Sequence, residues 1–140
     1  MEAKVIQIKG VTFLGKTDSN HWVPMDGPVE FQGSNAAIRP KELVLIGLGG
    51  CTGSDVSSIL TKMREPVRRF EIDLKAEVAA DHPKVFTKIN ITYKFWGENL
   101  NRTNIDKAIA LSQDKYCSVS AMLKKAVEIT HSCEINPEPG

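Results

Sequence analysis

Three cysteines, Cys51, Cys117 and Cys133, are the residues of this sequence best suited to covalent chemistry. Cys51 lies inside a segment that begins at Pro40 and predicts a long helix. Cys117 directly precedes Ser118, which is a favourable N-cap for a new helix. A thiol at a helix N-terminus meets unpaired N–H donors and the positive end of the helix dipole, which favours the thiolate. Because the thiolate is the nucleophilic form, the two cysteines could work as a pair in which one thiol attacks and the other resolves.

Two alternatives stay open from the residues alone. Most buried cysteines are small, inert hydrophobic residues, so Cys51 and Cys117 could simply belong to the core. Cys133 could instead complete a metal site with His131 and with Cys51 or His21, because positions 131 and 133 of a strand share one face. A zinc site usually shows two closely spaced ligand pairs, and this sequence shows one, so we expect no metal.

Length, charge and composition indicate an ordinary soluble protein. The chain of 140 residues predicts a single domain, residues 1–140, that can bury a core of its own. Its net charge is +1 with lysine and arginine scattered along the chain, which argues against nucleic-acid binding. No signal-like start is visible, and the apolar run Leu43–Leu48 is too short to span a membrane. We therefore expect a cytoplasmic protein with free thiols.

The segment Pro40–Arg64 predicts the helix that must position Cys51. Apolar residues recur along it at helical spacing, and Ile46–Cys51 is apolar or glycine on every side, which is typical of a buried helix. A glycine costs about 1 kcal/mol relative to alanine in a helix. The segment nevertheless contains four within seven residues: Gly47, Gly49, Gly50 and Gly53. Tight helix packing is the plain explanation, and we expect a partner subunit to cover this helix.

The remaining elements predict an α+β fold with segregated helices. Alternating polarity predicts an antiparallel meander of strands at residues 2–8, 11–14 and 21–25, a hairpin at 70–78 and 85–95, and a last strand at 127–135. Helical spacing predicts further helices at 105–115 and, capped by Ser118, at 119–127. Residues 26–39 are expected to form a loop and 136–140 a tail.

Two motifs resemble those of the OsmC/Ohr family of osmotically induced and organic hydroperoxide resistance proteins. The segment Pro40–Val56, PKELVLIGLGGCTGSDV, resembles the family's central-helix signature: a proline, a glutamate two residues later, an apolar run rich in small residues, and a cysteine. The segment Ser112–Ser120, SQDKYCSVS, resembles the second cysteine motif. The order of the predicted elements agrees along nearly the whole chain.

This resemblance implies an OsmC-like α+β fold with antiparallel sheets, a long buried central helix and two shorter helices, in an intertwined homodimer. It implies a thiol-dependent peroxidase acting on organic hydroperoxides without a cofactor. Cys51 would be the peroxidatic thiolate and Cys117 the resolving thiol. A lipoyl-like dithiol or a thioredoxin-type protein would reduce the resulting disulfide. Glu42 would orient a basic group beside the thiolate.

The sequence departs from the family at that basic group. Members of the family use an arginine from the N-terminal strand region, whereas residues 11–31 contain no arginine. Lys16 and His21 are the basic residues there, and Arg39 is a further candidate. Lysine lacks the bidentate fork of arginine and is no equivalent replacement. The departure indicates a divergent branch of the family.

The missing arginine also motivates a different class of function, a non-catalytic small-molecule binder or redox sensor on the same scaffold. Four aromatic residues could line an apolar pocket for a ligand or a hydroperoxide tail, or could equally be core residues: Trp22, Phe86, Phe95 and Trp96.

Overall fold

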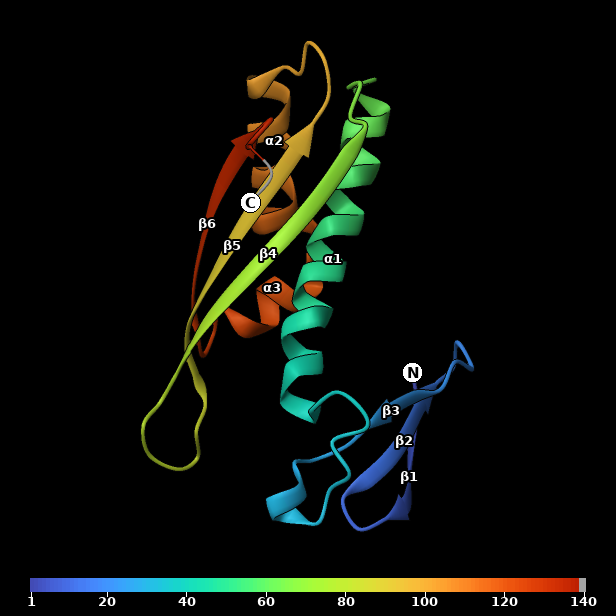
Figure 1. The fold of residues 1–140 in the computed structure, drawn as a ribbon. Coiled ribbons are helices and arrows are strands. Elements are labelled where there is room, and N and C mark those ends of the chain that lie inside the picture. The colour runs from blue at the N-terminus through green and yellow to red at the C-terminus, as the bar shows by residue number, and fades with distance from the viewer. Residues whose placement is uncertain (139–140) are drawn as a thin grey trace. The chain divides into compact units, whose positions relative to one another are not determined.

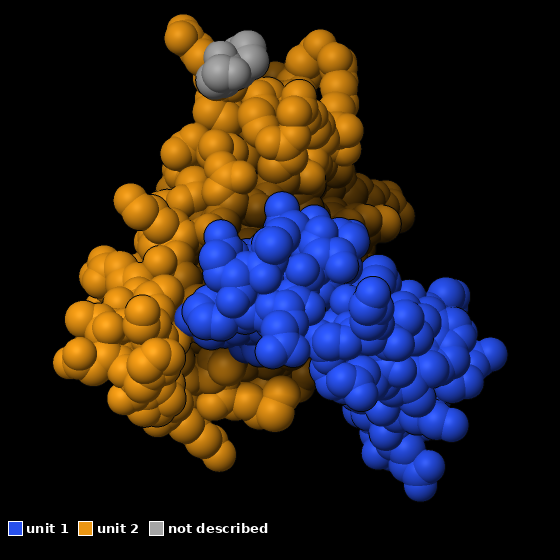
Figure 2. All heavy atoms as spheres, turned by 60° about the horizontal axis from the view of Figure 1, so that its bottom comes forward, with its two compact units in different colours: residues 1–44 blue, residues 45–140 orange. Residues whose placement is uncertain are grey.

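The computed structural model describes residues 1–138, and its contacts divide the chain into two compact units. Unit 1 is Met1–Val44 and unit 2 is Leu45–Gly140 (Figure 2). Helix α1 (Pro40–Lys62) contains the boundary between them. The single domain stays a prediction.

Unit 1 holds the predicted antiparallel meander. Strands β1 (Ala3–Lys9), β2 (Thr12–Thr17) and β3 (Val23–Met25) form one sheet in that order, followed by a 3-10 turn, η1 (Val29–Phe31) (Figure 1). Strand β2 extends further than predicted, because the backbone of Gly15, Lys16 and Thr17 pairs with β1.

The predicted loop at residues 26–39 is organised around the buried carboxylate of Asp26. This group accepts hydrogen bonds from the amides of Gly27 (2.7 Å), Ser34 (3.0 Å) and Ala36 (3.0 Å) and from the Thr12 hydroxyl (3.0 Å). The bond from Ala36 is the strongest influence, and together these donors outweigh burial and hold the pKa of Asp26 below its ordinary value. A buried charge thus has the partners that it requires.

Unit 2 contains a mixed sheet. Strands β4 (Arg69–Val78) and β5 (Phe86–Trp96) form the predicted antiparallel hairpin, and β6 (Glu128–Ile135) lies on the other side of β5 (Figure 1). The predicted last strand is confirmed, but β6 runs parallel to β5, which corrects the expectation of antiparallel sheets. The helices between β5 and β6 form the long crossover that a parallel pair requires.

The core of unit 2 lies on one face of this sheet. Ile89, Ile91, Tyr93 and Phe95 alternate along β5 and are all fully buried. The predicted long helix is confirmed as α1, but its buried residues occupy one face of it rather than its whole circumference: Leu48, Gly49, Thr52, Val56 and Leu60.

The glycines of α1 divide into two pairs. A Cβ at Gly49 would lie 2.7 Å from Leu74 Cδ1, and one at Gly53 would lie 2.8 Å from Ile72 Cδ1, so a side chain at either position would displace the end of a β4 side chain. This confirms tight packing for Gly49 and Gly53. A Cβ at Gly47 or Gly50 would have no atom of the described residues within 4 Å.

By length and composition alone, α1 could cross a membrane, with a mean hydropathy of 1.5 over an 18-residue window. This window is longer than the apolar run Leu43–Leu48 because it also includes glycine, serine and threonine residues. Core helices of soluble proteins have the same property, and one face of α1 packs into the core of unit 2.

The helices between β5 and β6 differ from the predicted ones at their ends. Helix α2 (Arg102–Leu111) begins early because Asn101 accepts hydrogen bonds from the Thr103 and Asn104 amides. A π-helical turn, η2 (Ser112–Tyr116), follows it, and the last helix is only α3 (Ser118–Leu123). In the predicted tail, the backbone amide of Asn136 donates to Phe95 O (2.7 Å). Residues 139 and 140 of this tail lie outside the described residues.

Candidate functional site

The structure brings Cys51 and Cys117 together inside unit 2. The two sulfur atoms and a carboxylate oxygen of Asp55 all lie within 4.8 Å of one another. The Ser118 hydroxyl lies 3.9 Å from Cys51 Sγ. Cys51 is half-buried on α1 and Cys117 is buried at the start of α3. Two thiols from distant parts of the sequence therefore form one site.

A buried hydrogen-bond network holds the elements that carry these thiols. Thr52, next to Cys51 on α1, has its hydroxyl 2.6 Å from the Tyr93 hydroxyl and 2.8 Å from the Ser112 hydroxyl. The Gln113 side-chain amide donates to the oxygens of Tyr93 (2.8 Å) and Thr52 (3.2 Å). The network joins α1, β5 and the π-helical turn, so it fixes the approach of one cysteine to the other.

The π-helical turn sets the position of Cys117. The backbone amide of Cys117 donates to Ser112 O (2.8 Å), and this bond closes the wide turn directly before α3. The Cys117 sulfur then accepts a hydrogen bond from the Ser120 amide (3.4 Å) and caps α3. The predicted N-cap Ser118 is therefore wrong by one residue. The hydroxyl of Ser118 is thereby free to approach Cys51 instead.

The two thiols differ in acidity for identifiable reasons. Burial raises the pKa of Cys51, but hydrogen bonds from the Val119 amide, Cys117 and the Ser118 hydroxyl outweigh it, so the pKa lies below its ordinary value. Burial also raises the pKa of Cys117, and the neighbouring Cys51 adds to this effect, so the pKa lies above its ordinary value. The expectation that the helix start favours a thiolate at Cys117 is therefore wrong, because burial outweighs the helix N-terminus. Cys51 is therefore the more readily ionised thiol of the pair.

Asp55 opposes the ionisation of Cys51, because its negative charge raises the pKa of that thiol. We expect Asp55→Asn to shift the Cys51 titration to lower pH while retaining the shape of the side chain. The Cys51 alkylation rate as a function of pH, measured in a Cys133→Ser background, would show this shift. A midpoint that is unchanged or moves to higher pH would contradict it.

Glu42, Arg39, Lys16 and His21, the other predicted site residues, all belong to unit 1. Glu42 accepts a hydrogen bond from the backbone amide of Arg39 (2.9 Å), as one half of a helix capping box. The Arg39 guanidinium donates to Asn35 Oδ1 (2.6 Å) and Ala37 O (3.0 Å). Their roles beside the thiolate stay predictions.

The two residues proposed from the strand region have local contacts. Lys16 donates to Asn20 Oδ1 (2.8 Å) and lies over the Trp22 ring, 4.9 Å from its centroid. His21 is exposed and lines a mainly apolar pocket of about 310 Å³ with Val5 and Met25.

Cys133 lies away from the paired thiols, on the inner face of β6. Burial raises its pKa, and the nearby charge of Arg102 lowers it only in part. In the part of the chain that the structure describes, Cys133 is not grouped with two further histidine, cysteine or acidic ligands. The metal site considered around His131 and Cys133 is therefore not assembled there.

The aromatic residues considered for an apolar pocket mostly serve other contacts. Phe95 is fully buried and stacks on Phe70 with ring centroids 4.4 Å apart. The Trp96 indole donates to Pro137 O (3.0 Å), and Trp22 lies under Lys16 in unit 1. Of the two interpretations, a pocket wall or packing within the fold, the second fits Phe95 and Trp96.

A pocket of about 290 Å³ opens at Asp55, the carboxylate that neighbours the two thiols. Its wall includes Asp55, the apolar side chains of Ile59 and Leu111, and the ring of Tyr116, next to Cys117. Lys62 also lines it. Tyr116 is 52% exposed, so it lines this pocket rather than burying the thiol.

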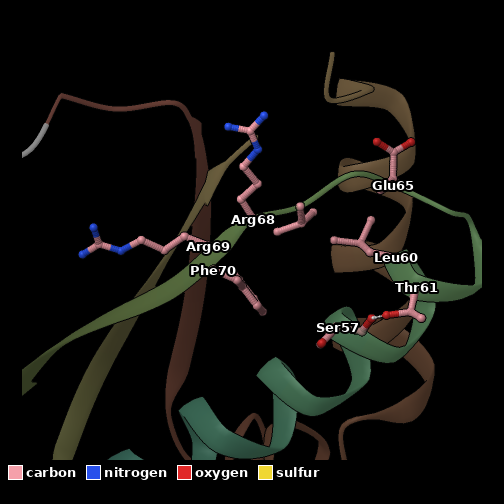
Figure 3. A pocket seen from close by; sticks show the side chains of 8 residues that line it. Ser57, Leu60, Thr61, Glu65, Arg68, Arg69 and Phe70 are labelled. Atoms are coloured by element: carbon pink, nitrogen blue, oxygen red, sulfur yellow. Dashed lines mark hydrogen bonds between the residues drawn. The ribbon is translucent and has the colours of Figure 1, made fainter. Parts of the chain in front are cut away.

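A second pocket, of about 210 Å³, lies between the end of α1 and the start of β4 (Figure 3). Its charged residues serve structural contacts: Arg68 donates to Glu98 (2.6 Å), and Glu65 accepts from the Asn101 amide (3.0 Å). Neither Asp55 nor either of the paired cysteines lines this pocket, so we do not assign the thiol chemistry to it.

Sequence reasoning missed the polar residues that surround the thiols. Asp55 follows Cys51 by four positions, a spacing that places both on one helix face, and this signal was available in the sequence. The network partners Thr52, Tyr93 and Gln113 carried no comparable signal, because they meet only through tertiary packing.

With this fold and paired-cysteine site, the chain belongs to the OsmC-like protein family, whose profile matches residues 33–132. It is 42% identical to protein YhfA of Escherichia coli strain K12 over 135 residues, covering 96% of this chain and 98% of YhfA.

Solved structures show the same fold. A hypothetical protein from Aquifex aeolicus VF5 is 33% identical, with a TM-score of 0.84 and coverage of 99% of this chain and 97% of that one. The organic hydroperoxide resistance protein OhrB of Bacillus subtilis is 16% identical, with a TM-score of 0.63 and coverage of 96% and 98%. The predicted family and the mixed α+β architecture are thus confirmed.

Proposed function

We propose that this chain is a thiol-dependent peroxidase that reduces organic hydroperoxides. The observation that carries the proposal is the approach of the Cys51 and Cys117 sulfurs to within 4.8 Å, on elements fixed by one buried network. The lowered pKa of Cys51 and the raised pKa of Cys117 support the division into attacking and resolving thiol. The organic hydroperoxide resistance protein among the structural neighbours is consistent with it.

The reaction divides into three steps: oxidation of Cys51, formation of a disulfide and its reduction. The Cys51 thiolate attacks the outer peroxide oxygen, the O–O bond breaks, and the alkoxide leaves as an alcohol after taking a proton, which leaves Cys51 as a sulfenic acid. The Cys117 thiol then displaces water from this sulfenic acid and forms a disulfide. An external dithiol, lipoyl-like or of the thioredoxin type, reduces the disulfide by thiol exchange. No cofactor enters the cycle.

The hydroperoxide tail would occupy the pocket of about 290 Å³ beside Asp55. Ile59, Leu111 and the Tyr116 ring provide apolar walls suited to a hydrocarbon chain. The pocket and the reactive sulfur share Asp55 as a neighbour, so we propose that a tail bound there directs the peroxide group toward Cys51.

A homodimer in the cytoplasm is part of this proposal. Ile46 of α1 is 56% exposed, and the positions of Gly47 and Gly50 have open space beside them. A second copy of the chain would cover this apolar surface, and a reducing compartment would keep the thiols free.

One observation favours a second function, a redox sensor oxidised once for each signal. The groups that lower the pKa of Cys51 are hydrogen-bond donors of Val119, Cys117 and Ser118, and the charge that acts on the thiol is the negative Asp55. A thiolate without a cation to polarise the peroxide would react slowly.

A dithiol-coupled assay with cumene hydroperoxide and tert-butyl hydroperoxide separates these functions. A peroxidase turns over many times and shows a Cys51–Cys117 disulfide by mass spectrometry when dithiol is withheld. A sensor consumes about one equivalent of peroxide for each chain and stops. Absence of both turnover and disulfide would refute the peroxidase.

The resolving role of Cys117 makes a separate prediction. We expect Cys117→Ser to let Cys51 react with peroxide but to leave it as sulfenic or over-oxidised acid, because no thiol remains to condense with it. Labelling with a sulfenate-selective reagent and mass spectrometry would detect the trapped species. An undisturbed catalytic cycle in this variant would exclude Cys117 from resolution.

A further inference from the structure

We propose that Cys51, Asp55 and Cys117 form a binding site for a borderline-soft divalent cation, with Zn²⁺ as the ion that best fits the donors. The ligand atoms of the three side chains lie within 4.8 Å of one another. This is the one group of three such ligands that we find within residues 1–138. It differs from the site around Cys133 that was considered in the sequence, and it departs from the expectation that the chain binds no metal.

The donor set and its spacing fit zinc. Cys51 and Asp55 are four residues apart on α1, so both project from one helix face, and Cys117 approaches from the start of α3. Two thiolates and a carboxylate are ligands that Zn²⁺ accepts, with a water molecule completing a tetrahedron. Ligands bound at about 2.3 Å lie about 3.8 Å apart, so closing the site requires shifts of about 1 Å at most.

The surroundings of these ligands already supply a second shell. The Ser112 hydroxyl donates to Asp55 Oδ2 (3.1 Å) and the Ser120 amide donates to Cys117 Sγ (3.4 Å). The Ser120 hydroxyl is fully buried without a well-formed hydrogen bond within the described residues, yet it lies near the Cys117 thiol and lowers its pKa. A metal-bound thiolate at Cys117 would be a stronger acceptor for this hydroxyl than the neutral thiol is.

The charge of the site also favours a divalent cation as its ligand. Once the thiols ionise, two sulfurs and a carboxylate concentrate negative charge in a partly buried volume, which a divalent cation neutralises. If the proposed peroxidase cycle is correct, the cation and peroxide compete. Each bound sulfur has donated the lone pair that attacks peroxide, and the Cys51–Cys117 disulfide no longer offers thiolate ligands.

Calorimetric titration of the reduced, chelator-treated full chain with ZnCl₂ tests the site without peroxide. We expect one ion for each chain. Titration with CoCl₂ is expected to produce the ultraviolet charge-transfer absorption of cobalt–thiolate bonds. Asp55→Asn should weaken Zn²⁺ binding by about tenfold or more, and Cys51→Ser and Cys117→Ser should each reduce the cobalt–thiolate absorption.

Cys133→Ser is the matched control, because it removes a thiol outside the cluster and should leave affinity and absorption unchanged. The proposal is overturned if the folded protein binds no Zn²⁺, if Asp55→Asn binds as tightly as the parent, or if only Cys133→Ser abolishes binding. The peroxidase assay is run with chelator present. Loss of the metal site and loss of the peroxidase are therefore separate outcomes.

Discussion

A Cys51→Ser protein is expected to lose hydroperoxide turnover down to the uncatalysed background, a fall of about a thousandfold or more. The serine hydroxyl is not ionised near neutral pH and cannot break the O–O bond. The hydrogen bonds from Val119 and Ser118, which favour the thiolate in the parent protein, would then meet a neutral hydroxyl that does not attack peroxide. The dithiol-coupled assay measures this loss directly.

The control for this experiment is Cys133→Ser, which removes a thiol from the inner face of β6 and leaves the paired cysteines intact. We expect it to keep the parent turnover. Mass spectrometry should find the Cys51–Cys117 disulfide in the control and no disulfide of Cys117 in Cys51→Ser. Normal activity in Cys51→Ser would show that another group attacks the peroxide.

Thr52→Val should produce the largest loss of stability that we predict. Valine keeps the shape of the side chain but deletes a fully buried hydroxyl in contact with the polar groups of Tyr93, Ser112 and Gln113. Leaving buried polar groups without partners costs about 1–3 kcal/mol, equivalent to a fall in Tm of roughly 5–10 °C. Chemical and thermal unfolding measure both quantities.

Thr61→Val on the same helix is the matched control. Thr61 is exposed and its hydroxyl donates only within α1, to Ser57 O (2.9 Å), so we expect a change within about 0.5 kcal/mol. Because the Thr52 network positions both cysteines, Thr52→Val should also slow disulfide formation after peroxide, whereas Thr61→Val should not. Equal stability losses in the two variants would disprove the structural role of the network.

Much of this architecture follows from local pattern. Alternation along residues 70–78 and 85–95 predicted the β4–β5 hairpin, because one buried face requires a period of two. Pro40 and the apolar residues after it predicted α1 nearly to its ends. The spacing of two cysteine motifs identified the family and the thiols that the structure places together.

Local pattern failed where a contact between distant segments overrides it. The sequence does not state the direction of β6, which is set by the crossover through α2 and α3. It predicted a regular helix through residues 112–115, but the bond from the Cys117 amide to Ser112 O widens that turn into a π-helix.

The sequence by itself thus determined which residues are the candidates for thiol chemistry, because the identity of a residue and its place in a motif are local properties of the chain. Only the tertiary structure decided how the two thiols differ. That difference depends on the Val119 amide and the Ser118 hydroxyl reaching Cys51, and on the depth at which Cys117 is buried. Solvation and hydrogen bonding of a side chain are set by segments distant in sequence, so they exist only once α1, β5 and the turn before α3 have packed together.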